Sequence, residues 1–309
     1  MSWVVASPFS ALAAGRARAR LRAGRWGDAM PEGWVWDETL YRGSAPYYAR
    51  GRPPYAPGLA DRLAALIPFA DGSRLLDVGC GPGILTLPLA PHVAEAVGVD
   101  PDPGMLAEAA RRATVAGVAN ARWVQARAEV LPAGLGRFRA ATFGQSFHWM
   151  DRERVAAAVR RLLEPGGAFV LVADAKEPRA DPGDPDLPHP EPPYEAIRGL
   201  IREWLGPVPR AGQGLLRHGT PDGEAAVLAV AGFAAPERLR LPAGGVWVRT
   251  EDEVVAWVWS LAGSAPHLFG ERLGAFEVEL RGLLRDVSPA GRFADRPPDT
   301  EVRMWRSPG

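Results

Sequence analysis

The sequence is poor in cysteine and histidine and carries no net charge. Cys80 is the single cysteine of 309 residues, so no disulfide can form within the chain. The five histidines add no CxxC or HExxH pattern, which argues against a zinc site. Basic and acidic residues number 36 each, so no global field draws the chain to nucleic acid or an anionic membrane. No apolar run approaches the roughly 20 residues that span a bilayer. We therefore expect a cytoplasmic protein without a metal, nucleic-acid or membrane partner.

Composition divides the chain into four segments. Residues 1–40 begin apolar and continue arginine-rich, and we interpret them as a poorly ordered extension rather than a targeting arm. Residues 41–175 contain the regular patterning of a core domain. Residues 176–221 hold a proline-rich loop and a helical insert, and residues 222–309 are expected to complete the sheet and shape a substrate site.

Short apolar runs alternate with amphipathic helical patterns between residues 74 and 174, which predicts an α/β fold with a parallel sheet covered on both faces. Strands are expected at 74–79, 94–99, 121–125, 140–147 and 168–173, with later returns near 237–241 and 300–306. Asp102 and Asp151 are predicted helix N-caps. A ligand should bind beyond the carboxyl ends of the strands, at the topological switch point.

One later helix is apolar on nearly every side. Thr250 and Glu253 form a capping box that opens it, and Val254 to Leu261 contains no charged residue. Such a helix must be covered, either by ordinary packing or as the lid or wall of a pocket, and the sequence leaves both interpretations open.

The turn from Asp77 to Gly83 carries the sharpest chemical signal. Its glycines permit positive φ and close approach of the backbone to a ligand, and the helix that follows offers free N–H groups. The spacing is G-x-G-x-G rather than the dinucleotide pattern G-x-G-x-x-G. Asp77 would repel a pyrophosphate but suits a ligand with an ammonium group. Cys80 is expected to serve as a small loop residue, because no histidine is placed to activate its thiol.

Asp100 follows the second predicted strand, 23 residues after Asp77. An acid at that position can accept hydrogen bonds from both hydroxyls of a ribose. A helix-capping role is less attractive because Asp102 fills it better. The two carboxylates together favour a ligand with both an amino-acid part and a nucleoside part.

Around these residues the sequence resembles the class I S-adenosylmethionine-dependent methyltransferases, most clearly over residues 41–175. The resemblance rests on five segments, namely 75–83, Gly98-Val99-Asp100 with Met105-Leu106, 128–132, Ser146-Phe147-His148-Trp149 and 163–167. It implies a Rossmann-like, doubly wound, mostly parallel seven-stranded sheet with a helical lid or insert. It also implies S-adenosyl-L-methionine as cofactor.

The resemblance assigns cofactor contacts residue by residue. Gly79, Cys80 and Gly81 would hold the methionyl part and Asp100 the ribose, with Met105 on the adenine ring. The segment Arg127, Ala128 and Glu129 would flank adenine, although an arginine replaces the acid that many relatives carry and cannot accept a hydrogen bond. Upstream, Arg52 would pair with the methionyl carboxylate and Tyr48 would cover the methyl group, unless Arg52 is simply a surface residue in a proline-rich turn.

Two polar residues follow the fourth strand, where a methyl acceptor would sit. His148 is the best candidate for a general base, its alternative being a structural histidine stacked beside Trp149, and Gln145 could orient cofactor or acceptor. The Asn/Asp-Pro-Pro-Tyr/Phe motif of exocyclic-amine methyltransferases is missing there, and so is an acidic pair for magnesium. These absences favour a small-molecule acceptor methylated on oxygen, nitrogen or carbon. A cofactor-binding protein without transferase activity is the alternative, and a nicotinamide-dependent oxidoreductase ranks third.

Overall fold

A computed structural model describes residues 39–175, 184–208, 210–211, 214–215 and 223–308. Nearly all of the predicted extension at 1–40 and much of the proline-rich loop at 176–193 therefore lie outside the described residues.

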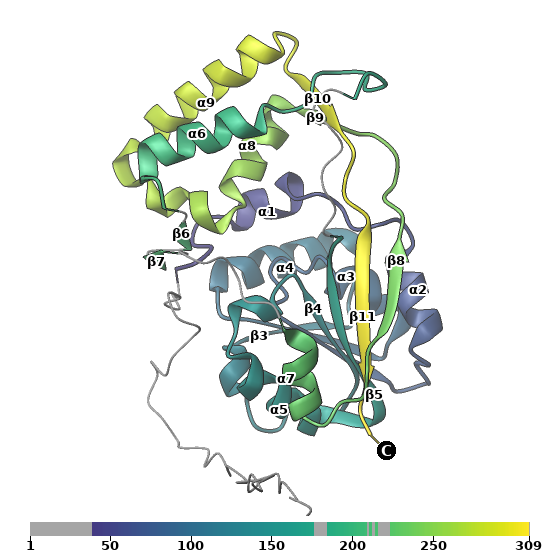
Figure 1. Ribbon diagram of the computed structural model, residues 1–309. Helices are drawn as coiled ribbons and strands as arrows, with labels where there is room; N and C mark the ends of the chain where they lie inside the picture. Colours follow the sequence, from purple (N-terminus) through teal and green to yellow (C-terminus); the bar gives the residue numbers. More distant parts are fainter. Residues whose placement is uncertain (1–38, 176–183, 209, 212–213, 216–222, 309) are drawn as a thin grey trace, which may run out of the picture.

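The core is one sheet of seven strands in the order β3-β2-β1-β4-β5-β11-β8 (Figure 1). The first five strands run parallel, and β11 pairs antiparallel with both β5 and β8. The bounds are β1 (Arg74–Val78), β2 (Glu95–Asp100), β3 (Ala121–Gln125), β4 (Phe138–Gly144), β5 (Leu163–Asp174), β8 (Glu237–Leu241) and β11 (Thr300–Arg306). The predicted mostly parallel seven-stranded fold is confirmed.

Helices cover both faces of this sheet. They are α2 (Leu59–Leu66), α3 (Thr86–Leu89), α4 (Pro103–Ala116), α5 (Arg152–Leu162) and α7 (Glu224–Val230). In the sheet, β2 and then β3 lie on one side of β1, and β4 and then β5 lie on the other. Because crossover connections between parallel strands are right-handed, α3 and α4 lie on one face of the sheet and α5 lies on the other face. The topological switch point lies between β1 and β4, where a crevice opens at the carboxyl ends.

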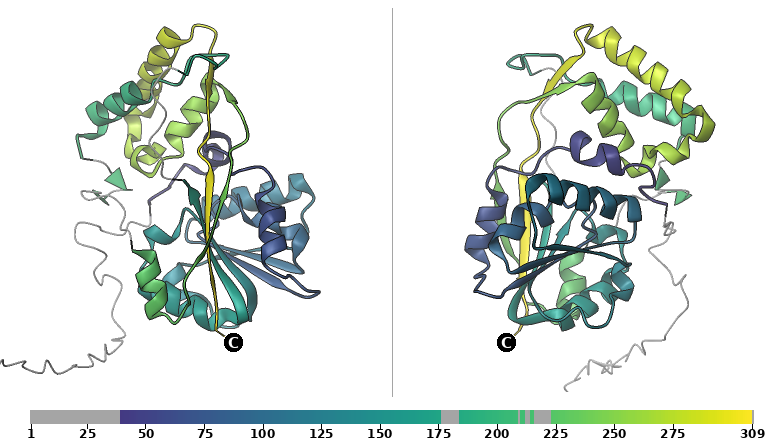
Figure 2. Two further views of the ribbon diagram at one scale, coloured as in Figure 1. Left: turned by 45° about the vertical axis from the view of Figure 1, so that its right-hand side comes forward. Right: turned by 180° about the vertical axis from the view of Figure 1, so that it is seen from behind.

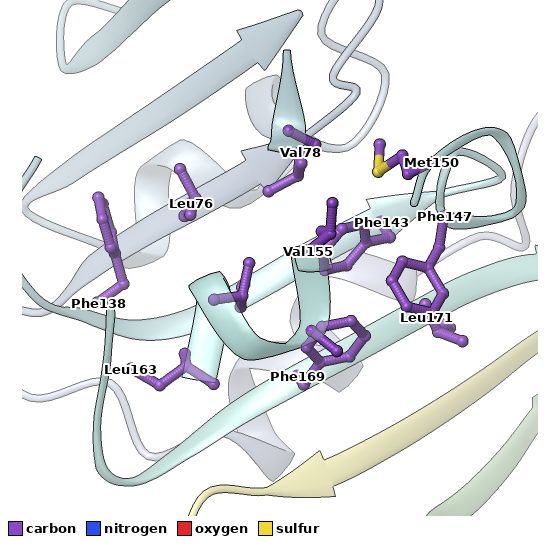
Figure 3. Close-up of a cluster of buried hydrophobic side chains, with 14 of the residues drawn as sticks. Leu76, Val78, Phe138, Phe143, Phe147, Met150, Val155, Leu163, Phe169 and Leu171 are labelled. Carbon is purple, nitrogen blue, oxygen red and sulfur yellow. The ribbon is translucent and has the colours of Figure 1, made fainter. Parts of the chain in front are cut away.

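Two apolar clusters hold the layers together. On one face, aromatic side chains of β4 and β5 pack under α5, with Phe143 stacked on Phe169 at 4.5 Å between ring centroids (Figure 3). On the other face, Leu63 of α2 and Leu89 of α3 cover the strands. The predicted N-caps are present, because the Asp102 side chain accepts from two backbone N–H groups of α4 and Asp151 accepts from one of α5. Buried strands thus need both helical layers, as the parallel arrangement requires.

A second group of elements forms a helical cap above the carboxyl ends of the parallel strands (Figures 1 and 2). It contains α1 (Ala45–Gly51), α6 (Tyr194–Leu205), α8 (Glu251–Trp259), α9 (Leu273–Val287) and the antiparallel pair β9 (Trp247–Thr250) with β10 (Arg292–Asp295). Apolar side chains of α6, α8 and α9 form their own cluster. The capping box of Thr250 and Glu253 is confirmed. The apolar helix α8 is therefore buried inside the cap, which is the ordinary-packing interpretation. Within the described residues, no helix is both long and apolar enough to cross a membrane.

The segment from Ser44 to Arg52, which contains α1, packs against the C-terminal end of α8. Gly51 of α1 has no space for a side chain, because a Cβ there would lie 2.3 Å from the backbone of Ala256 and Trp257. Four successive carbonyl oxygens, from Trp257 to Ser260, accept side-chain hydrogen bonds. The donors are Ser260 Oγ, Ser264 Oγ, Ser44 Oγ and Arg52 Nη2, at 2.7, 2.6, 2.7 and 2.8 Å in that order. The carbonyls that a helix leaves unpaired at its C-terminus are thus satisfied, half of them from α1 and its flank.

Candidate active site

The glycine turn after β1 lies at the switch point. Gly79, Gly81 and Gly83 all have positive φ, the conformation that favours glycine. A Cβ on Gly79 would lie 2.6 Å from the Cβ of Ser146, whereas one on Gly81 would enter open space. The backbone N–H groups of Gly79 and Cys80 donate to Val99 O at 2.8 and 3.1 Å and hold the turn against β2. The turn therefore offers backbone at Gly81 to a ligand.

Asp77 is buried beneath this turn. Its two carboxylate oxygens accept hydrogen bonds from Thr86 Oγ1 at 2.5 Å and Thr142 Oγ1 at 2.8 Å. Burial raises the pKa of Asp77 to about 6, against the lowering effect of the two hydroxyls. The carboxylate is fixed in place and still lines the pocket described below.

Asp100 ends β2 with a side chain that is only 8% exposed. Its Oδ2 accepts from the backbone N–H of Gly81 at 2.8 Å and its Oδ1 from that of Asp102 at 2.9 Å. Each carboxylate oxygen keeps a second lone pair. Burial raises the pKa of Asp100 to about 7, outweighing these hydrogen bonds. The Asp100 carboxylate is thus held in a fixed orientation, and a further hydrogen bond from a ligand hydroxyl would stabilise its ionised form.

Gln145 follows β4 with a φ of 52°, and within the described residues it alone has a positive φ without being glycine. Its side chain hydrogen-bonds to Asp174, at the end of β5, and Ser146 beside it donates to Val78 O at 2.6 Å. Such backbone strain persists only when the surroundings impose it, and it is concentrated at functional sites. The strand therefore stops at Gly144, earlier than the expected residue 147.

Two pockets meet at the glycine turn. The charged pocket, of about 60 Å³, contains Arg52, Asp77 and Asp174 together with Cys80 and Tyr55. The apolar pocket, of about 80 Å³, is lined chiefly by the side chains Leu40, Tyr41, Asp100, Met105, Trp149 and Met150. Both pockets share Tyr48, Gly79, Gly81, Gly144 and Gln145. One compartment is suited to a zwitterion and the adjoining one to a flat apolar ring beside a hydroxyl-binding carboxylate.

The hydrogen bonding of Arg52 indicates which kind of ligand would fit the charged pocket. Its Nη2 is committed to Ser260 O, whereas its Nε is buried and has no hydrogen-bond partner among the described residues. An unsatisfied buried donor is costly unless a ligand completes it. A carboxylate beside Arg52, with an ammonium group near Asp77 and Asp174, would satisfy the pocket's charges. Together with Asp100 and the open Cβ position of Gly81, these residues fit the amino-acid and ribose parts of S-adenosylmethionine.

A larger chamber of about 400 Å³ adjoins both pockets and shares Tyr48 and Gln145 with them. His148 lines it and packs against Trp149, with ring centroids 4.8 Å apart. The cap supplies the remaining wall from α6 and from the turn at 261–264 that follows α8. The turn after α8, rather than α8 itself, thus reaches the site.

Most residues expected from the sequence meet around the two pockets. Those that line one or both are Tyr48, Arg52, Asp77, Gly79, Cys80, Gly81, Asp100, Met105 and Gln145. Burial raises the pKa of the Cys80 thiol well above its usual range, consistent with a packing role. Within the described residues there is no cluster of potential metal ligands.

The predicted adenine-flanking segment is placed differently. Ala128 is buried in the core cluster beneath α5. Glu129 accepts the backbone N–H of Asp151 at 3.0 Å and forms an ion pair with Arg127. Neither side chain is among the described residues that line the two pockets, so adenine contacts by this segment remain a prediction.

Several residues that line the pockets were not predicted from the sequence. Asp174 could have been found, because it ends the fifth strand at the same edge as Asp77 and Asp100. Tyr41 and Met150 carry no such signal, since apolar residues are equally typical of a core. Burial raises the pKa of Tyr41 above its usual range, and its ring packs edge-on against Tyr48 and Trp149.

Fold and site define the class to which this domain belongs. A mostly parallel seven-stranded sheet with a glycine turn after β1 and an acid at the end of β2 is the arrangement of class I S-adenosylmethionine-dependent methyltransferases. Residues 75–167 match the family model described as a methyltransferase domain. This segment belongs to that family, and S-adenosylmethionine is its cofactor.

Three individual comparisons add detail. An uncharacterised methyltransferase of Mycobacterium tuberculosis is 38% identical over 146 residues, which cover 46% of this chain and 56% of the relative. An S-adenosyl-L-methionine-dependent Diels-Alderase of Talaromyces variabilis is 31% identical over 130 residues, covering 40% and 44%. The crystal structure of the cyclase SpnF, 21% identical, superposes with a TM-score of 0.50 over 88% of this chain and 95% of its own. The chain thus matches about half the length of these curated relatives, and the solved structure supports the fold alone.

Proposed function

We propose that the protein transfers the methyl group of S-adenosylmethionine to a small-molecule acceptor held in the chamber. The observation that carries this proposal is that Tyr48 and Gln145 line the two pockets and the chamber alike. Their side chains therefore stand where a donor in the pockets would face an acceptor. The neutral charge balance argues against a nucleic-acid acceptor.

Bound S-adenosylmethionine would supply a methyl group on a sulfonium, which is already a good leaving group. The chain's task is then mainly to align and desolvate the reactants. Arg52, Asp77 and Asp174 would fix the amino-acid part, and Asp100 the ribose. Gln145, held in its strained conformation and bonded to Asp174, would orient donor and acceptor at the junction. We assign cofactor binding to residues 41–175 and acceptor shaping to the described parts of 184–308.

His148 is our candidate for the general base. It lies just past β4 on the wall of the chamber, so an acceptor hydroxyl or amine could reach its imidazole. We expect His148→Gln to lower kcat/KM by about 100-fold or more, with an unchanged cofactor Kd, because general-base catalysis contributes about 10²–10⁴-fold. The measurement is release of S-adenosylhomocysteine from a metabolite panel, and the pH profile should lose its acidic limb. An unaltered rate would reduce His148 to a packing residue.

A second candidate function is cofactor binding without methylation. The observation that favours it is that one relative and one solved structure are named a Diels-Alderase and a cyclase. A chamber with aromatic walls would suit such catalysis. The same assay separates the two, since acceptor turnover without release of S-adenosylhomocysteine would support the second and overturn the first.

A further inference from the structure

The chamber has a distinct division of chemistry. Its larger apolar and aromatic side chains include Tyr41, Trp149, Ile201, Leu205, Val208 and Leu261. Its charged side chains are Arg52, Arg198 and Arg202, and no acidic residue is among the described residues that line it. In a chain with equal numbers of acids and bases, this is a local excess of positive charge.

Arg198 and Arg202 stand one turn apart on α6, so both guanidinium groups emerge on the same face of the helix. Neither residue lines the charged or the apolar pocket. They therefore belong to the chamber alone, whereas Arg52 serves the cofactor compartment as well. Charge at this wall cannot be explained by cofactor binding.

The two arginines are available to a ligand. Arg198 pairs with Glu195, whose side chain is 82% exposed, and ion pairs so exposed contribute little. The Arg202 guanidinium makes no hydrogen bond to any described residue in the structure, although its place in the last turn of α6 suits the helix dipole. A planar carboxylate can accept two parallel hydrogen bonds from a guanidinium, which is the strong form of such contacts.

We propose, on the basis of the function proposed above, that the acceptor is an organic acid with an apolar body and a carboxylate that binds Arg198 and Arg202. The apolar body lies between the aromatic and aliphatic walls. Because these arginines line neither cofactor pocket, the carboxylate serves for recognition and is not the methylated group. The acceptor thus carries a second, nucleophilic group that faces Gln145 and His148.

The test is a binding experiment that needs no turnover. The full chain, saturated with S-adenosylhomocysteine, is titrated with a panel of aromatic and aliphatic carboxylic acids, their methyl esters and the corresponding phosphate monoesters. We compare the wild type with Arg198→Gln, Arg202→Gln and the double variant. Arg62→Gln, an exposed arginine on α2, is the matched control.

We expect acids to bind at least tenfold more tightly than their esters, and the double variant to lose that preference. Ester affinity, S-adenosylhomocysteine affinity and the control should stay within about twofold. Equal binding of acids and esters, no binding of any acid, or a preference that survives the double variant would each overturn the proposal. A preference for phosphates would overturn its choice of carboxylate. Failure of the proposed function is a separate result, because it appears as absence of methyl transfer even where acids bind.

Discussion

The cofactor compartment and the acceptor chamber are built on different principles. The first is made from the carboxyl ends of β1, β2, β4 and β5, with buried carboxylates whose positions are fixed by hydrogen bonds from Thr86, Thr142 and the backbone of Gly81. The second is walled largely by helices and by turns far apart in the sequence, and the two charged side chains that it does not share with the cofactor compartment, Arg198 and Arg202, are exposed on α6. Residues at the edge of a sheet are held in place by the strands, whereas side chains on a cap helix such as α6 can be replaced without moving the sheet.

Substitution of Asp100 is the strongest test of this contrast between the cofactor compartment and the acceptor chamber. We expect Asp100→Ala to raise the Kd for S-adenosylmethionine by about 100-fold, because two charge-assisted hydrogen bonds contribute about 1.5 kcal/mol or more each. Isothermal titration measures the affinity, and thermal unfolding checks that the variant folds. Asp71→Ala, at an exposed aspartate before β1, is the control and should bind normally. Retained affinity in Asp100→Ala would remove this acid from the site.

A second prediction concerns the contact between α1, which lines both regions through Tyr48, and α8 of the cap. Gly51→Ala should lower the free energy of unfolding by about 3 kcal/mol, because the new Cβ would press on the backbone of α8 and overpacking typically costs about 1–3 kcal/mol. Gly199→Ala is the matched control, since no atom lies within 4 Å of its Cβ position on α6. That change should stabilise the protein by up to about 1 kcal/mol through helix propensity. Denaturant unfolding of both variants measures the two free energies of unfolding. Equal stabilities would show that α1 does not pack tightly against α8.

The smallest expected effect is a pH dependence confined to the cofactor compartment. Burial raises the pKa of Asp100 to about 7 and that of Asp77 to about 6. Their contribution to the stability of the free protein is therefore complete below about pH 4, near their unfolded values, and is lost as the pH rises through 6 to 7. A hydroxyl that donates to Asp100 favours the ionised form, so cofactor affinity should rise roughly tenfold from pH 6 to pH 8.

Titrations at pH 6, 7 and 8 measure this effect. Asp100→Asn should bind more weakly and lose most of the slope, because its amide does not titrate in this range. A flat affinity profile in the wild-type protein would mean that Asp100 is already ionised before the cofactor binds.

Sequence alone predicted the first region far better than the second. The carboxyl ends of parallel strands lie at one edge of a sheet, so an acid that follows a predicted strand could be placed there. The strands β3, β8 and β11 have the residue bounds that the patterning predicted. The end of β4 was missed because Gln145 adopts a left-handed conformation that no propensity favours. The start of β5 was missed because Leu163 pairs with Phe138 of β4 across a shift in register, a contact that the local sequence pattern does not reveal.

Of the residues that line the chamber, only His148 and Gln145 were predicted from the sequence to lie beside an acceptor. The other large side chains that line it are mainly tyrosines, leucines and arginines, each typical of a core or a surface, and only the packing of the cap on the sheet brings them together. The glycine turn, by contrast, could be predicted as a ligand site from the spacing of its glycines. A turn that needs glycine leaves a local signature in the sequence, whereas a cavity made from common side chains does not.

The capped end of α8 has a consequence for how the chain folds. Ser44 and Arg52 reach carbonyls that lie 215 and 208 residues further along the sequence. Closing so large a loop is entropically costly until the strands between have assembled, and contacts of high sequence separation slow folding. We therefore expect this end of the helix to be completed late, after the sheet, so that weakening these two bonds accelerates unfolding more than it slows folding.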